Sequence, residues 1–243
     1  MIPRFFVAFP LAAPSEVALP AAAAHHASQA LRLKRGDAVT LFDGGGGEYG
    51  GEIGSATPRA VEVRVTERRT VERESTLDVT LAQSLIAGER MDAVIQKAVE
   101  LGATAIVPIA SARSVTRLEG ARIERRREHW RQIVIAACEQ CGRNRLPAVL
   151  PPHELGAWLE RPSSASVRLL LSPSGPQSLG GLAVPRGSVE LLVGPEGGLA
   201  PEEEAAAIAA GYRALRLGPR ILRTETAGPA MLAALNALWG DWR

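Results

Sequence analysis

The chain has 243 residues, of which 46% are hydrophobic and 22% charged, a balance that suits one large or two modest domains and excludes global disorder. The formal net charge of +2 is too small to indicate nucleic-acid binding by itself, and no apolar run approaches the roughly 18 residues of a membrane span. The N-terminus lacks the cationic start and long apolar block of a secretory signal, so we expect a cytoplasmic protein.

The first 72 residues are predicted to form a small β-barrel, because short alternating strands dominate and turn signals separate them. The strands end at turns such as Gly44–Gly47, and a charged stretch around Arg68–Ser75 marks a domain boundary. The expected elements are strands at Ile2–Phe9, Ala38–Phe42, Tyr49–Ile53 and Val61–Val65, and a short helix at His25–Leu33.

Residues 73–243 show a different pattern, in which short apolar runs alternate with amphipathic stretches. This alternation is typical of an α/β domain with a mainly parallel sheet. The expected strands are Leu77–Leu85, Ala105–Ile109, Val167–Leu171 and Val189–Val193; the expected helices run from about Met91 to Leu101, from Ile123 to Cys141, and through Met231–Trp239.

Basic residues are almost all arginine, with Lys34 and Lys97 as the only lysines. Arginine suits bidentate contacts to phosphate, although solvated helix faces explain the same distribution. The two cysteines, Cys138 and Cys141, form a C-x-x-C at the end of a predicted helix. A redox pair favours the helix N-terminus and a structural zinc site needs four ligands, so we expect two simple thiols and no metal.

Two stretches with similar organisation stand out near the C-terminus. Val189–Val193 is followed by Gly194-Pro-Glu-Gly-Gly198, and then Pro201 with three glutamates indicates the first turn of a helix. Leu215–Ala227 repeats this order, with Gly218 after the apolar run and Thr224 or Thr226 as helix N-cap. Two glycine turns so close together predict one ligand site at the carboxyl edge of a parallel sheet.

These turns do not match the common nucleotide motifs. The chain has no G-x-x-x-x-G-K-[ST] for a triphosphate and no G-x-G-x-x-G after the first strand of the α/β region. It also has no recognisable Ser-His-Asp arrangement. A Gly-Pro-Glu-Gly-Gly turn alone is a weak signal, since a purely structural turn would explain it.

The combination of motifs is specific, and the sequence resembles the 16S ribosomal RNA uridine N3-methyltransferase family of the SPOUT superfamily. The resemblance extends almost from end to end. The motifs that carry it are Pro3–Phe6, Leu31–Asp37, Gly88–Asp92, Ile95–Gly102, Glu139-Gln140 with Arg143, Gly194–Gly198, Leu217-Gly218 and Ile221–Ala227.

The resemblance implies a PUA-like barrel at residues 1–72 and a SPOUT methyltransferase domain with a trefoil knot at residues 73–243. It further implies S-adenosylmethionine as cofactor, 16S ribosomal RNA in the small ribosomal subunit as substrate, and a homodimer. Residues expected to bind the cofactor are Leu171, Ser172, Gly194, Pro195, Glu196, Gly197, Gly198, Leu217, Gly218, Ile221, Leu222 and Thr226.

Uracil N3 carries a proton, so a methyltransferase must remove it or stabilise the anion. Candidates are Glu225 as base, or Arg220 and Arg223 as cations; alternatively, Glu225 is only a helix-start acid and the arginines hold phosphate. The residues expected to contact RNA are Arg4, Arg32, Lys34, Arg35, Glu139, Gln140 and Arg143.

The chain departs from the family pattern at a few positions, which are Ala87, Cys141, Leu199 and Ala200. These changes leave the glycines of the turns intact but put the capping of the following helix in question. Two other functions remain open. One is ribose 2′-O-methylation by another SPOUT enzyme, and the other is a non-catalytic RNA-binding role in ribosome assembly.

Overall fold

The computed structural model describes residues 2–116, 118 and 120–242. The chain divides into two compact units, the first comprising Met1–Glu74 with Ile135–Leu146, and the second Ser75–Val134 with Pro147–Arg243. This division lies close to the boundary predicted after residue 72, but it places a later segment, Ile135–Leu146, in the first unit. Among the described residues, no helix is both long and apolar enough to cross a membrane.

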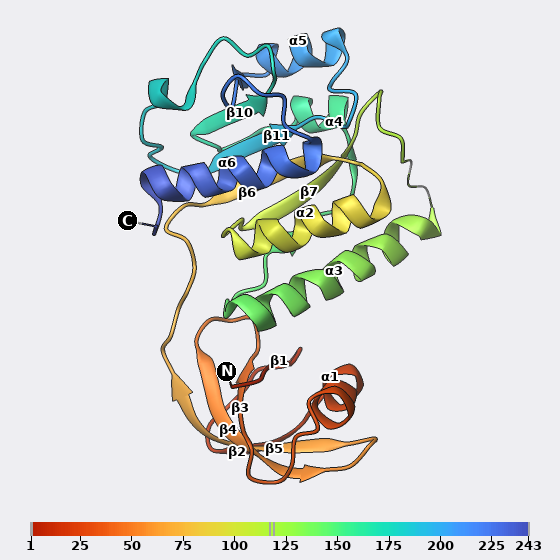
Figure 1. The fold of residues 1–243 in the computed structure, drawn as a ribbon, viewed down its shortest axis with the longest axis vertical. Helices are drawn as coiled ribbons and strands as arrows, with labels where there is room; N and C mark the ends of the chain where they lie inside the picture. Colours follow the sequence, from red (N-terminus) through yellow and green to blue (C-terminus); the bar gives the residue numbers. More distant parts are fainter. Residues whose placement is uncertain (1, 117, 119, 243) are drawn as a thin grey trace. The chain divides into compact units, whose positions relative to one another are not determined.

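The first unit is built on a mixed five-stranded sheet with the order β1-β3-β4-β5-β2 (Figure 1). Strands β1 and β3 are parallel, and the other neighbours are antiparallel. The strands are β1 (Arg4–Phe6), β2 (Ser15–Ala18), β3 (Ala38–Phe42), β4 (Glu48–Ala56) and β5 (Val61–Arg69).

The alternation of residues in β5 determines which side of this sheet becomes the core. Val61, Val63 and Val65 are buried, whereas the residues between them are exposed, as the sequence predicted. The three valines pack with Phe5 and Ile53 in one apolar cluster. The glycine turn between β3 and β4 adopts positive φ angles at three of its residues, which are conformations that glycine tolerates best.

The helix of the first unit begins earlier than predicted. Instead of His25–Leu33, it comprises α1 (Ala21–His25), followed by a π-helical turn at His26–Ala30. Alanine has the highest helix propensity, so the alanine run after Pro20 starts the helix.

The second unit contains a seven-stranded sheet in which every pair is parallel, as predicted. The order is β12-β10-β11-β6-β7-β8, with β9 also paired to β7. Its strands are β6 (Val79–Ser84), β7 (Ala105–Ala110), β8 (Ala148–Val149), β9 (His153–Glu154), β10 (Val167–Leu171), β11 (Val189–Val193) and β12 (Arg213–Leu215).

Helices cover both faces of this sheet, so its central strands are buried on both sides. Helices α2 (Gly88–Glu100) and α6 (Thr224–Trp239) lie side by side over one face, and α4 (Leu155–Glu160) and α5 (Pro201–Ala209) lie over the other (Figure 1). Helix α3 (Ala121–Cys141) belongs to both units, because the division falls within it.

Glu190 is the one charged residue of the buried strand β11, and it is held in a polar cluster. It accepts hydrogen bonds from the Tyr212 hydroxyl at 2.7 Å and from Ser163, and it pairs with Arg161 at 2.8 Å. Burial opposes its ionisation, but these hydrogen bonds outweigh burial and hold the pKa of Glu190 below its ordinary 4.5.

Several short elements were missed from the sequence, among them β2, β8, β9 and α4. The final strand was also misplaced: β12 ends at Leu215, where the apolar run was predicted to begin. Segments of two to six residues are too short to show a helical or strand period.

Candidate functional site

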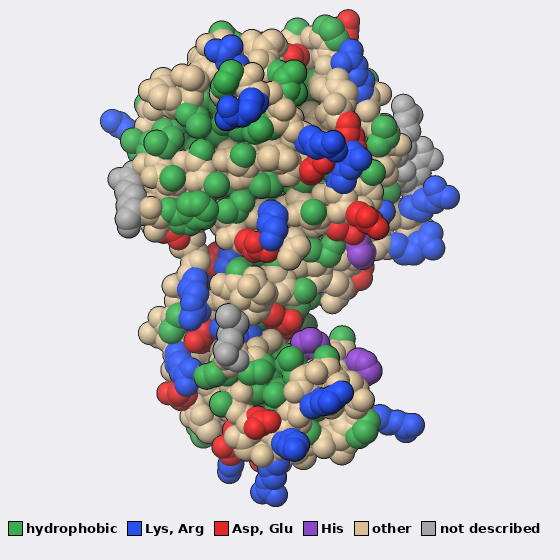
Figure 2. All heavy atoms as spheres, in the orientation of Figure 1, with side chains coloured by type: hydrophobic (Ala, Val, Ile, Leu, Met, Phe, Trp, Pro, Cys, Tyr) green, Lys and Arg blue, Asp and Glu red, His purple; other side chains and the backbone are tan. Residues whose placement is uncertain are grey.

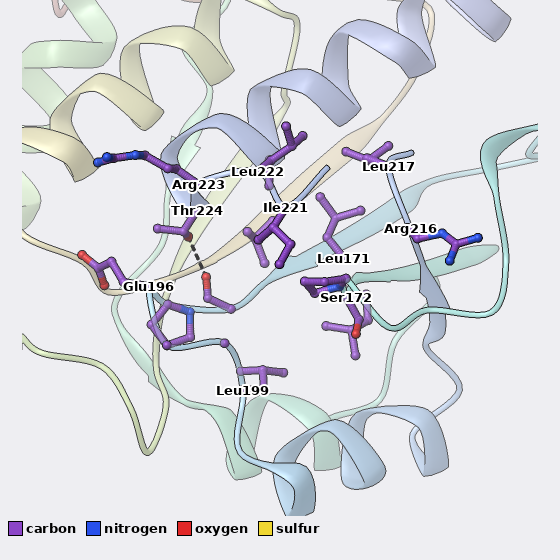
Figure 3. A pocket seen from close by; sticks show the side chains of 18 of the residues that line it. Leu171, Ser172, Glu196, Leu199, Arg216, Leu217, Ile221, Leu222, Arg223 and Thr224 are labelled. Carbon is purple, nitrogen blue, oxygen red and sulfur yellow. Dashed lines mark hydrogen bonds between the residues drawn. The ribbon is translucent and has the colours of Figure 1, made fainter. Parts of the chain in front are cut away.

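A cavity of about 680 Å³ lies in the second unit where β10, β11 and β12 end. This volume falls within the usual range for a small-molecule site, about 300–1,000 Å³. Its walls come from the residues after these strands, from the first turn of α6, and from Arg90 of α2. Figure 3 shows Leu171, Ile221 and Leu222 lying together, with Glu196 and Arg223 at one side.

The first wall is the turn Gly194–Gly198, where the backbone is closely packed. A Cβ atom added to Gly194 would lie 3.0 Å from the Leu199 nitrogen, so a side chain there would push on the next part of the same turn. Gly198 has a φ of +67°, and the Arg113 guanidinium donates to the Gly197 carbonyl at 2.8 Å. The contacts of the chain itself therefore define this wall.

Helix α5 begins directly after this turn, and Ala200 is its N-cap residue. Alanine cannot cap the helix with its side chain, but the carboxylate of Glu203 supplies the other half of a capping box, the acceptor for the N-cap amide. It accepts hydrogen bonds from the amides of Ala200 at 2.9 Å and Ala112 at 2.7 Å. The departure from the family pattern at Ala200 thus removes the N-cap acceptor but leaves the Glu203 half of the capping box in place.

The second wall is the segment Leu217–Leu222, which follows β12. It presents apolar side chains to the cavity, and Ile221 is 82% exposed. Gly218 has a φ of +74°, and a Cβ atom added there would meet nothing within 4 Å. At Gly218 and Ile221 this wall is therefore more open than the first wall is at Gly194.

The first turn of α6 closes the site between these walls. Neither threonine caps the helix as predicted, since the N-cap residue is Arg223 and no side-chain cap bond is formed. Thr224 is instead buried, and its hydroxyl donates to the Gly194 carbonyl at 2.6 Å. Thr226 is exposed and does not line the cavity.

Charged side chains alternate in sign along the edge of the cavity. Arg90 lies 3.3 Å from a Glu196 carboxylate oxygen and 4.0 Å from one of Glu225, and Arg223 lies 3.9 Å from the same Glu225 oxygen. Arg223 is the most exposed of these four, at 77%. Arg220 also lines the cavity and is exposed. The three proposed catalytic residues are thus brought to one cavity.

The structure brings most of the predicted cofactor residues to this cavity; Gly218 and Thr226 do not line it. Sequence reasoning assigned no role to Arg90, although it lies within a motif that carried the family resemblance. It also missed Arg216 and Ser174, although Ser174 belongs to a Ser-Pro-Ser-Gly turn after β10 that signalled a strand end.

The residues predicted to contact RNA all belong to the first unit, where they fall into two groups. Arg4 pairs with Glu48 at 2.6 Å, Arg143 is 4% exposed and pairs with Glu74, and the Glu139 carboxylate accepts from the Phe6 amide. These contacts favour a structural role for Arg4, Glu139 and Arg143. Arg32, Lys34, Arg35 and Gln140 are exposed.

Burial shifts the pKa of two titrating groups within residues 135–146 in the same direction. It raises the pKa of Glu139 above the ordinary value and raises that of the Cys138 thiol to about 12. Cys138 and Cys141 are both free thiols, as predicted. Among residues 2–116, 118 and 120–242, no group of three or more metal-ligating side chains occurs.

Comparison with known proteins identifies the two parts of the chain. Residues 73–236 match the RNA methyltransferase domain family, and residues 19–66 match the RNA methyltransferase PUA domain family. Ribosomal RNA small subunit methyltransferase E of Buchnera aphidicola is 32% identical over 99% of this chain and 98% of its own length. The protein of that name in Bacillus subtilis is 34% identical over 87% of this chain and 86% of its own length.

Solved structures agree with this assignment. Ribosomal RNA small subunit methyltransferase E from Neisseria gonorrhoeae, bound to S-adenosyl methionine, superimposes with a TM-score of 0.94 at 39% identity over 100% of both chains. A Legionella pneumophila protein, solved in complex with the cofactor SAM, gives a TM-score of 0.96 at 34% identity over 99% of each chain. The chain therefore belongs to the RNA methyltransferase family that includes the ribosomal RNA small subunit methyltransferases E.

Proposed function

We propose that this protein transfers a methyl group from S-adenosylmethionine to the N3 atom of a specific uridine in 16S ribosomal RNA. The observation that carries the proposal is the cavity itself. It lies between the two glycine turns that the sequence singled out, in a chain that belongs to a family of RNA methyltransferases.

The residues around the cavity fit such a cofactor. Apolar side chains suit an adenine ring, and Leu171, Leu217, Ile221 and Leu222 supply them. Hydroxyl and carboxylate groups, including those of Ser172 and Glu204, suit ribose hydroxyls and the cationic ends of the molecule. At Gly198, a Cβ atom would meet nothing within 4 Å, so the backbone there is open to close approach by a ligand.

Bound S-adenosylmethionine would supply an electrophilic methyl group on a positively charged sulfur. The protein then has to position the base and manage the N3 proton. Glu225 lines the cavity beside Arg90 and Arg223, and its carboxylate is a candidate acceptor for that proton because of this position. Arg223 and Arg220 are candidates for stabilising the uracil anion, because both reach the cavity with exposed guanidinium groups.

Family membership also supports the finer architecture that the resemblance implied. We infer that the segments around β11, β12 and α6 form a trefoil knot and that the first sheet closes into a PUA-like barrel.

The exposed groups of Arg32, Lys34 and Arg35 would hold the RNA backbone. Arg32→Ala should reduce the salt dependence of RNA binding by about one unit of slope, and an unchanged slope would remove Arg32 from the interface.

A homodimer is the state that the resemblance implies. Trp242 is 55% exposed and is a candidate apolar contact for a second copy. Analytical ultracentrifugation would test this, since a monomer at micromolar concentration would contradict it.

A ribosomal RNA substrate would also be consistent with a location in the cytoplasm, where bacterial ribosomes assemble.

Mass spectrometry of ribosomal RNA from a deletion strain tests the function as a whole. We expect one methyl group to be lost from the base of a single uridine in 16S RNA and to return with the wild-type gene. Loss of a ribose methyl group would indicate 2′-O-methylation instead. Unchanged RNA would contradict the proposal and favour a non-catalytic role.

A further inference from the structure

Thr224 and Gln83 form a buried hydrogen-bonded chain beneath the cavity. The Thr224 hydroxyl donates to the Gly194 carbonyl at 2.6 Å, drawn as a dashed line in Figure 3, and accepts from the Gln83 side-chain amide at 3.0 Å. Gln83 is completely buried on β6, and its amide also donates to the Ser84 carbonyl at 3.2 Å. These hydrogen bonds thus link β6 in the middle of the sheet, the start of α6 and the start of the first glycine turn.

The direction of these hydrogen bonds is fixed by chemistry. A side-chain NH₂ has two hydrogens and only donates, so one hydrogen goes to Ser84 and the other to Thr224. The Thr224 hydroxyl must then accept from Gln83 and use its single hydrogen for Gly194. A rotated Gln83 amide would place its oxygen against the Ser84 carbonyl, so the three bonds support one another.

Gln83 is a costly residue for this position if its only role is to fill space. Its side-chain oxygen has no hydrogen-bond partner among the described residues, and an unpaired buried polar atom opposes folding. An apolar residue of similar size would avoid that cost in a strand that already buries Val79, Leu81 and Ala82. The hydrogen bond from Gln83 to Thr224 offsets this cost, because it fixes the orientation of the Thr224 hydroxyl.

Thr224 stands between two residues proposed to face the target base, Arg223 and Glu225. We propose that Gln83 and Thr224 are positioning residues that set the distance between the first glycine turn and the first turn of α6. This inference rests on the proposed function, since it treats the glycine turn as the cofactor side and α6 as the base side of the site. Neither residue needs to touch the reacting atoms.

The test is calorimetric titration of S-adenosylmethionine into purified full-length variants. Thr224→Val keeps the shape but leaves the Gly194 carbonyl and the Gln83 amide without their partner. Such a loss corresponds to about a tenfold change in an equilibrium constant, so we expect about tenfold weaker binding and a lower kcat. Thr224→Ser keeps the hydroxyl and should restore binding to within about twofold of wild type.

Ser75→Ala is the matched control for loss of stability. It also removes a side-chain hydrogen bond to α6, from Ser75 to Asn236 at 2.7 Å, but lies at the other end of the helix and does not line the cavity. We expect this variant to melt at a lower temperature and bind the cofactor normally. Equal loss of affinity in Ser75→Ala and Thr224→Val would overturn the inference, because affinity would then follow stability alone.

Gln83→Met provides a second route if Thr224→Val does not fold. It should weaken binding in the same direction, and the double variant should lose little more than the worse single variant, since the two residues act as one unit. Fully additive losses, or affinity within about twofold of wild type in the folded single variants, would contradict the proposal. The wild-type titration separates the two claims, because a wild-type protein that does not bind S-adenosylmethionine would refute the proposed function itself.

Discussion

The two glycine turns that border the cavity look alike in sequence but are built differently. A Cβ atom on Gly194 would lie 3.0 Å from a backbone nitrogen, whereas one on Gly218 would meet nothing within 4 Å. Arg113, Glu203 and Thr224 brace the first turn or the residues that follow it. The second turn instead exposes Ile221.

This difference separates the roles of the two turns in binding. The first turn is already shaped before a ligand arrives, because side chains from other elements hold it. In the part of the chain that the structure describes, no side-chain hydrogen bond or ion pair holds residues 217–222, so we expect the ligand to contribute more to the final conformation of this turn. Substitutions in the first turn should therefore change both stability and affinity, and substitutions of exposed side chains in the second should mainly change affinity.

The largest effect is expected for Gly194→Ala. The added methyl group would press on the Leu199 amide, and overpacking of this kind costs about 1–3 kcal/mol. Affinity for S-adenosylmethionine should fall about tenfold to hundredfold by calorimetry. Gly218→Ala is the comparison variant: its only cost is the left-handed φ, about 1 kcal/mol. If Gly218→Ala proves more harmful than Gly194→Ala, the comparison is reversed.

Glu203→Ala should have the next largest effect. It removes the acceptor for the amides of Ala200 and Ala112, and loss of a helix cap costs about 0.5–2 kcal/mol. Urea denaturation should show this loss of unfolding free energy. Glu202→Ala, an exposed residue in the same helical turn, is the control and should be near neutral. Equal stability of the two variants would show that Glu203 does not brace the first turn.

Ile221→Ser should affect binding without affecting the fold. The side chain is 82% exposed, so its removal should change the free energy of unfolding by less than about 0.5 kcal/mol. Burying it against a ligand contributes on the order of 1 kcal/mol, which predicts about fivefold weaker cofactor binding. A clear fall in melting temperature would show instead that the second turn is already packed.

The smallest effect is expected when the pH is lowered and Glu190 becomes protonated. Glu190 lies on β11, the strand that precedes the first glycine turn. The pKa of Glu190 is lowered, so its contribution to stability is present above the ordinary value of 4.5 and is lost as the pH falls through the lower folded value. Melting temperature should therefore decline as the pH falls below 4.5. Glu190→Gln should flatten that decline; an identical slope in both proteins would assign it to other carboxylates.

The sequence predicted those parts of the site that depend on local pattern. The apolar run Val189–Val193 and the acid-rich helix start after it were correct, because both signals lie within a few residues. The caps assigned to Thr224 and Thr226 were wrong, since the buried hydroxyl binds Gly194, which is 30 residues away in sequence. Local propensity cannot anticipate a partner that only the parallel sheet brings close.

The roles of the arginines in the first unit were also difficult to predict from local sequence. Arginine is the residue type expected on an RNA-binding surface. Arg4 and Arg143 nevertheless have largely buried side chains that form ion pairs with carboxylates. Arginine in sequence does not distinguish a phosphate contact from a buried ion pair. Arg90 was missed for the opposite reason, because a helix-start arginine in a motif gives no sign that it will reach a cavity formed by distant loops.

The most direct test of the central claim is methyl transfer by the purified protein. Small ribosomal subunits from a deletion strain would be incubated with isotope-labelled S-adenosylmethionine, and the digested RNA would be analysed by mass spectrometry. The account predicts label in 3-methyluridine at one position of 16S RNA. Label on a ribose, on another base, or no label at all would contradict it.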